Sequence, residues 1–492
     1  MGLGLPGQDV SLPSYDFLCR GTAPQRRGLQ PVDGGQTDCR QYVPKGRGPT
    51  ALQRAVREGL PAFLAEADEW GGLPTSLVRE FVAATTCGDV SRGFVLVKCL
   101  ACGEALRVGF TCHGRTVCPG CTARRAAATA AHLVDEVLPR CPYRQWTLAF
   151  PRGLKVPLAS DSALLAAAVR AFVRGLFALQ RRQARALGIE KPRPGAVAFV
   201  QHFTSALLLH PHAHVLVPEG VFCGDDKSFA QLPPPTDEDV EVLLRKVAKK
   251  VLQLAAARYP EGLPYADDAQ AALAAASAQT RLPLGEVVVA PRAGRRCAFL
   301  EGFSLHANTA VHENDRESLE RLCRYGARGP VALDRLTFRE DGRLEYRLKR
   351  PSRGGATVLV LTPVQLLKRL CALVVKPKVH LTRYFGVFAP NANARAEVVA
   401  QRPRPPGPES ESESPAKDAA PRDARPPRLN FADLLRRTLG VDLFSCPCGG
   451  RRVVVAFITT EEAARKALGL RPRDAAPRHR ATGPPQLALA LA

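Results

Sequence analysis

The chain has 492 residues, enough for two or three domains that each bury a core, and 46% of its residues are hydrophobic. Lysine and arginine outnumber aspartate and glutamate by 69 to 46, so the formal net charge is +23. This surplus favours a polyanionic partner such as nucleic acid, although a GC-rich genome also raises the arginine content. No apolar run reaches the roughly 18 residues of a membrane span, and the N-terminus lacks the pattern of a signal peptide. We therefore expect no membrane partner and a cytoplasmic location, where fifteen cysteines suit metal sites better than disulfides.

Composition and hydrophobic periodicity divide the chain into six segments of an α+β protein. These are a disordered start at 1–48, a helical and zinc-binding N-terminal domain at 49–139, a larger domain at 140–400, a disordered linker at 401–428, a small C-terminal module at 429–470 and a tail at 471–492. The order predicts two folded units joined to a third by a linker.

Within the larger domain, alternating apolar residues predict strands at 144–151 and 195–204. A long amphipathic helix is predicted at 160–188, with a serine or aspartate cap and Gly188 as its stop signal. A capped helix follows at 314–326, and a hairpin that turns at Asp341–Gly342 follows at 334–350.

Two cysteine pairs, "CLAC" and "CPGC", have the spacing of a zinc ribbon. Cys99, Cys102, Cys118 and Cys121 offer four thiolates, which close a tetrahedral Zn²⁺ site and leave no open position for chemistry. Cys112 and His113 lie between the pairs, and either can replace one ligand. The later "CPCGG" is half of a second metal site or a turn made by proline and glycine.

The run "LLLHPHAHVLV" places three histidines on alternate positions of a strand, at 210, 212 and 214. Alternate side chains share one face, so His212 and His214 can chelate one divalent ion. Structural histidines held by hydrogen bonds are the alternative. Two imidazoles do not fill the coordination sphere of the ion, so a third ligand is needed. The preceding strand carries two candidates, Gln201 and His202. A neutral site with open positions suits Mg²⁺ or Mn²⁺ holding a phosphate.

With "HPHAH", the stretches "CGEALRVGFTCHGRTVCPGCTARR", "RQWTLAFP", "LERLCRYGARGP" and "HLTRYFGVFAPNA" resemble the insertion sequence ninety-one family, rolling-circle transposases like those of the common-region elements. The resemblance covers roughly residues 42–400 and, in addition, the "CPCGG" module. It implies a zinc-binding domain followed by an HUH (His-hydrophobic-His) nuclease domain, a ferredoxin-like antiparallel sheet flanked by helices. It also implies cleavage of single-stranded DNA at element ends by a tyrosine, through a 5′-phosphotyrosine.

Carried over position by position, the resemblance assigns His212 and His214 to the metal, Gln201 to the third ligand in preference to His202, and Tyr325 to the nucleophile. Two-tyrosine members have a second tyrosine four residues earlier, where this chain has Arg321, so the single-tyrosine class is implied. Tyr384 is the runner-up, although its strand-like apolar context suits a core role. The basic residues expected to contact DNA are Arg321, Arg324, Arg328, Lys349, Arg124 and Arg125.

Two other classes compete with a DNA strand transferase. A decayed, non-catalytic DNA-binding protein would keep the zinc ribbon and lose turnover. A cupin-type metal enzyme would share the His-x-His pair but explains neither the charge nor the ribbon.

Overall fold

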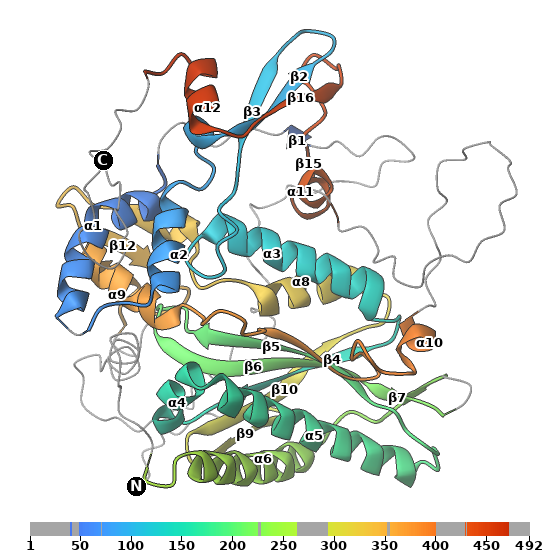
Figure 1. Ribbon diagram of the computed structural model, residues 1–492. Helices are drawn as coiled ribbons and strands as arrows, with labels where there is room; N and C mark the ends of the chain where they lie inside the picture. The colour runs from blue at the N-terminus through green and yellow to red at the C-terminus, as the bar shows by residue number, and fades with distance from the viewer. Residues whose placement is uncertain are drawn as a thin grey trace, which may run out of the picture.

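The computed structural model describes residues 40–41, 49–69, 71–224, 228–262, 294–351, 355–399, 429 and 431–471 (Figure 1). The segment expected to be disordered at 1–48, apart from residues 40–41, lies outside the described residues, as do the linker 401–428 and all but the first residue of the tail.

A six-stranded sheet forms the centre of the molecule, and every pair of neighbouring strands in it is antiparallel. Its order is β14 (Thr382–Gly386), β5 (Gly195–Phe203), β6 (Leu209–Pro218), β4 (Tyr143–Ala149), β10 (Phe303–Val311) and β9 (Cys297–Leu300). The strands expected at 144–151 and 195–204 are β4 and β5. The mixed α and β character with an antiparallel sheet is confirmed.

Helices cover both faces of this sheet (Figure 1). On one face α4 (Lys155–Ser160), α5 (Ser162–Ala186) and α6 (Asp237–Arg258) pack on residues such as Ala213 and Val215. On the other face α3 (Pro119–His132) and α8 (Arg316–Ala327) cover residues such as Phe199 and Leu216. Alternation along β5 and β6 therefore separates the face of Ala213 and Val215 from the face that carries His214.

Helix α5 begins and ends as its sequence predicts. The Asp161 carboxylate accepts hydrogen bonds from the backbone amides of Ala163 and Leu164, at 2.8 and 3.0 Å. Gly188 adopts a φ of +73° just after the last turn, a conformation that favours glycine. By length and hydropathy α5 alone among the described helices could cross a membrane, but half of its apolar window is buried against the sheet and α6, as in a core helix.

The N-terminal helices share a second core with a distant part of the chain. Helices α1 (Ala51–Asp68) and α2 (Thr75–Thr85) pack against α9 (Pro363–Leu373) and a three-stranded sheet. That sheet consists of β11 (Leu336–Phe338), β12 (Leu344–Arg347) and β13 (Val358–Leu361). Strands β11 and β12 form the hairpin expected at Asp341–Gly342. The apolar residues of 49–139 are therefore buried partly by residues of 140–400.

A small three-stranded sheet lies at one end of the molecule, in the order β16, β2, β3 (Figure 1). Strands β2 (Phe94–Cys99) and β3 (Ala105–Gly109), which we call the ribbon, form a hairpin, and β16 (Arg452–Ile458) pairs antiparallel with β2. The segment expected to form a separate C-terminal module is thus joined to the N-terminal ribbon. Its other elements are α11 (Phe431–Leu439), β15 (Val441–Asp442) and α12 (Glu461–Ala467).

The remaining elements are short. They are β1 (Arg40–Gln41), which pairs in parallel with β15, the pair β7 (Gly220–Phe222) and β8 (Phe229–Gln231), and α10 (Arg395–Val399).

Candidate active site and cysteine clusters

The three alternate histidines of β6 lie side by side. Their ring centroids are 5.4 Å apart for His210 and His212, and 4.9 Å apart for His212 and His214. Between the pairs Leu209–Phe203 and His212–Gln201, β6 uses one residue more than β5, which makes a β-bulge next to Pro211. Proline suits a bulge because it has no amide hydrogen to give to the ladder.

Hydrogen bonds set the orientation of two of the imidazoles. Nδ1 of His212 donates to the carbonyl oxygen of His210 at 2.8 Å, which leaves the lone pair on Nε2. Nδ1 of His214 lies 3.0 Å from the Thr147 hydroxyl, and its Nε2 is buried without a hydrogen-bond partner. The buried, unpartnered Nε2 of His214 and the Nε2 lone pair of His212 are two nitrogen donors that could bind one cation.

Gln201 is paired across the strands with His212, so the two side chains leave the sheet on the same face. Its amide nitrogen donates to the carbonyl oxygens of Tyr325 and Gly326, at 2.8 and 2.9 Å. Because both partners are acceptors, the amide orientation is set, and Oε1 is left buried and unpartnered. His202 also has a buried, unpartnered Nε2, but it is Gln201 that stands in register with His212.

The imidazoles are neutral at ordinary pH. Burial lowers the pKa of His212 to about 4, with a further contribution from the positive charge of Arg328. Burial and the neighbouring His212 lower the pKa of His214 well below its usual range. Burial also lowers the pKa of His210 to about 3. Two neutral imidazoles and an amide oxygen are a donor set that fits a divalent cation with open positions.

Tyr325 lies beside this set. Its ring meets that of His214 edge to face, with centroids 5.6 Å apart and an interplanar angle of 79°. The next residue allows this approach, because a Cβ added at Gly326 would lie 2.6 Å from Cγ of Phe199 on β5. Only glycine lets α8 pack so closely on the sheet, a role that the sequence reading did not assign to it.

Two of the expected basic residues contact the Tyr325 ring. The Arg328 guanidinium carbon is 4.6 Å from the ring centroid and 5.1 Å from that of Phe203, and its Nε is buried without a partner. Lys349 Nζ is 5.7 Å from the Tyr325 centroid. Positive charge therefore gathers beside the phenol.

The other expected basic residues lie elsewhere. Arg321 forms an ion pair of 2.6 Å with Glu317, and Arg324 is half-buried next to Tyr325 in the sequence. On α3, Arg124 stacks on Phe431 of α11 at 5.1 Å. Arg125 is exposed and donates to the carbonyl oxygen of His113 at 3.0 Å.

The runner-up tyrosine, Tyr384, lies on β14 and packs against the core on the α8 side of the sheet. Burial raises the pKa of its phenol, and the Arg395 guanidinium lies 5.7 Å from its ring.

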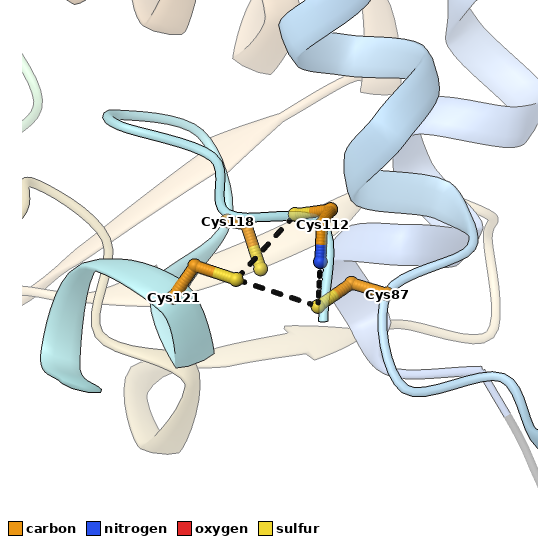
Figure 2. A group of neighbouring side chains, drawn as sticks. All are labelled: Cys87, Cys112, Cys118 and Cys121. Atoms are coloured by element: carbon orange, nitrogen blue, oxygen red, sulfur yellow. Dashed lines mark hydrogen bonds between the residues drawn. The ribbon is translucent and has the colours of Figure 1, made fainter. Parts of the chain in front are cut away.

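The cysteines form two clusters and not the single expected one. Cys87, Cys112, Cys118 and Cys121 meet at the start of α3 (Figure 2), whereas Cys99 and Cys102 lie with Cys446 and Cys448. The prediction that Cys99, Cys102, Cys118 and Cys121 bind one ion is therefore wrong. The hairpin β2–β3 carries its turn away from Cys118 and Cys121, and β16 brings the "CPCGG" turn to it instead.

The first cluster fits zinc. Sγ of Cys121 is 3.6 Å from that of Cys87 and 3.5 Å from that of Cys112 (Figure 2). Four sulfurs at about 2.3 Å from a central ion are separated by about 3.8 Å, close to these values. The sequence offered Cys112 and His113 as alternative zinc ligands. Cys112 is a member of the cluster, and His113 is not.

Two family models match the chain. One, described as "Putative transposase", matches residues 195–396, which contain the histidines, Gln201 and Tyr325. The other, described as "Transposase zinc-binding domain" and defined for insertion sequence ninety-one, matches residues 56–150, which contain the whole first cluster. No curated protein and no solved structure matches the chain. The two models together span more than half of the sequence, and the chain belongs to the insertion sequence ninety-one family of transposases.

Proposed function

We propose that this transposase is an HUH-type strand transferase of the single-tyrosine class. It nicks and joins single-stranded DNA at mobile-element ends through a 5′-phosphotyrosine on Tyr325, as in rolling-circle transposition. The observation that carries the proposal is the contact of the Tyr325 ring with His214, next to two buried and unpartnered atoms, His214 Nε2 and Gln201 Oε1.

His212, His214 and Gln201 are the residues that would hold Mg²⁺ or Mn²⁺. Such an ion polarises a phosphodiester and offsets the charge that develops on it. The three side chains come from β5 and β6, two adjacent interior strands of the sheet, so their positions are fixed by the ladder and not by a loop.

The cleavage step needs no reactant besides the DNA strand and the Tyr325 hydroxyl. The Tyr325 oxygen forms a bond to phosphorus while the bond from phosphorus to the 3′ oxygen breaks. The phenolic proton leaves to solvent, and the departing oxygen takes up a proton to become a 3′-OH. Joining is the reverse attack by a 3′-OH on the phosphotyrosine.

The surroundings of Tyr325 suit a single strand of DNA. Arg328 and Lys349 supply positive charge for the scissile phosphate, and Phe203 offers a second ring, 5.1 Å from the Arg328 guanidinium carbon. Arg124 and Arg125, on the helix that follows the first cysteine cluster, would add contacts to element-end DNA. We place this activity in the bacterial cytoplasm, at the nucleoid.

Arg321 supports the single-tyrosine class. It occupies the position where two-tyrosine members carry their second tyrosine, and it is held by Glu317 and the Ser318 hydroxyl, both at 2.6 Å. One tyrosine must then serve successive cleavages, or a 3′-OH or water must act as the second nucleophile.

Incubation of the purified protein with Mg²⁺ and single-stranded oligonucleotides from the DNA flanking its coding sequence tests the proposal. A covalent adduct on Tyr325 is expected by mass spectrometry of the peptide, and Tyr325→Phe should abolish it while Tyr384→Phe keeps it. An adduct on Tyr384 would overturn the assignment. DNA binding without any adduct would indicate an inactive DNA-binding protein derived from a transposase.

A further inference from the structure

The C-terminal residues 431–471, which we call the C-terminal clasp, dock on the N-terminal ribbon. Strand β16 adds to the edge of β2, and Leu443 packs against Val97 and Leu106 in a small shared core. At the other end of the clasp, Glu461 forms an ion pair of 2.7 Å with Arg92. The two segments are more than 300 residues apart in the sequence.

Two tight turns meet where the clasp joins the ribbon. The backbone amide of Leu100, between Cys99 and Cys102, donates to the carbonyl oxygen of Arg451 at 3.0 Å. A Cβ added at Gly450 would lie 2.7 Å from the Ala101 Cβ and 2.9 Å from the Cys99 sulfur. The second glycine of "CPCGG" is therefore required for the second turn to reach the first.

The four cysteines of these turns have the spacing of a metal site. Sγ of Cys99 is 3.6 Å from that of Cys448, and Sγ of Cys102 is 3.6 Å from that of Cys446. All four sulfurs lie within 4.8 Å of one another. These separations are near the 3.8 Å or so of a tetrahedral zinc site and far beyond the roughly 2.05 Å of a disulfide.

A buried cation lies next to the sulfurs. The Arg452 side chain is only 2% exposed and forms an ion pair of 2.7 Å with Glu104. Its NH1 group donates to the carbonyl oxygen of Ser445 at 2.7 Å, and its charge interacts with Cys446 and Cys99. Four thiolates around one Zn²⁺ carry a net charge of −2, which a buried guanidinium offsets.

We propose that Cys99, Cys102, Cys446 and Cys448 bind a second structural zinc ion that fastens the C-terminal clasp to the ribbon. Two of the ligands, Cys446 and Cys448, lie outside both matched family models. The inference does not rest on the tyrosine mechanism.

The zinc ion also sets the position of α11. In the clasp, Arg437 on this helix pairs with Asp135 and, at 2.8 Å, with Glu320 on α8, the helix that carries Tyr325. The ribbon and α8 are therefore linked through the clasp, and the ion would hold the middle of the clasp, at Cys446 and Cys448.

The test compares the zinc content and amide exchange of the full-length protein with those of two variants. The wild type should hold two zinc ions per chain by elemental mass spectrometry, and C446S/C448S should hold one. The matched control C223S/C297S changes two cysteines outside both clusters and should keep two. In C446S/C448S the β16 amides should exchange at least about tenfold faster, while those of β5 and β6 stay protected.

Three results would overturn the proposal. They are a wild type with one zinc ion per chain, a C446S/C448S protein that still holds two, and an intact mass showing the four cysteines joined as disulfides. Unchanged protection of β5 and β6 excludes general unfolding as the cause of zinc loss. Loss of DNA cleavage is not among the readouts, so the outcome is independent of the proposed function.

Discussion

Gly326→Ala probes the distance between α8, which carries the proposed nucleophile, and strands β5 and β6, which carry the proposed metal ligands. The added Cβ would lie 2.6 Å from Cγ and 2.7 Å from Cδ2 of Phe199, both atoms of a ring whose own strand is interior to the sheet. Carbon atoms pack at about 3.5 to 4.0 Å, so α8 has to retreat by about 1 Å. The hydrogen bonds from Gln201 to the Tyr325 and Gly326 carbonyls would lengthen with it.

Gly326→Ala should lower both the stability of the fold and the rate of adduct formation. Overpacking costs about 1–3 kcal/mol, and the gain in helix propensity from glycine to alanine returns up to about 1 kcal/mol. A displacement of about 1 Å between reacting groups lowers a rate by roughly 10²-fold. We therefore expect a small fall in melting temperature and a fall of about two orders of magnitude in adduct formation, measured under single-turnover conditions with single-stranded oligonucleotides.

Gly59→Ala is the matched control. Its added Cβ would lie 2.8 Å from Cβ of Pro363, between α1 and α9, so it overpacks a helix interface away from Tyr325. It should lower the melting temperature similarly and leave the rate per folded molecule unchanged. A Gly326→Ala protein that reacts at the wild-type rate, or a Gly59→Ala protein that slows equally, would refute the reasoning.

Three further changes give separate expectations. Lys349→Ala should weaken single-stranded DNA binding and make its salt dependence shallower by about 0.7 in log–log slope, because one phosphate contact is lost. Asp161→Ala should lower stability by about 1–2 kcal/mol in chemical denaturation, since α5 loses its N-cap and Arg258 its partner. Cys87→Ser should remove the zinc ion of the first cluster from the elemental count, although Cys87 lies outside the C-x2-C pairs.

Each of these has a control. Lys246, exposed on α6, should leave the salt slope unchanged when replaced by alanine, and an equal effect there would contradict a local role for Lys349. Asp161→Asn keeps a capping side chain and should recover most of the loss. A Cys87→Ser protein with an unchanged zinc count would contradict the first cluster as described.

The sequence predicts local features of this fold well. The Asp161 cap, the Gly188 stop and the Asp341–Gly342 turn depend on neighbouring residues alone, and the structure shows each of them. The shared face of His212 and His214 follows in the same way from strand alternation. The role of Tyr325, more than a hundred residues later, was predicted from the family resemblance, because no local pattern links this residue to β6.

The cysteine partners were not predictable from spacing. The C-x2-C pair nearest in sequence to Cys99 and Cys102 is Cys118 and Cys121, but their partners in space are Cys446 and Cys448. That pairing depends on β16 reaching β2, a non-local contact that periodicity does not encode. The β-bulge beside Pro211 was also missed, although a proline inside a strand is a signal for one.

The pairing of β16 with β2 delays the folding of the N-terminal sheet until the end of synthesis. A ribosome finishes Phe94–Cys99 long before it reaches Arg452–Ile458, so the early strand waits with one edge open while the catalytic sheet is made. Such late closure is slow because the ends must find each other across the whole chain. A nascent transposase therefore completes its N-terminal sheet last, and an interrupted message yields a protein in which the open edge of β2 is never paired.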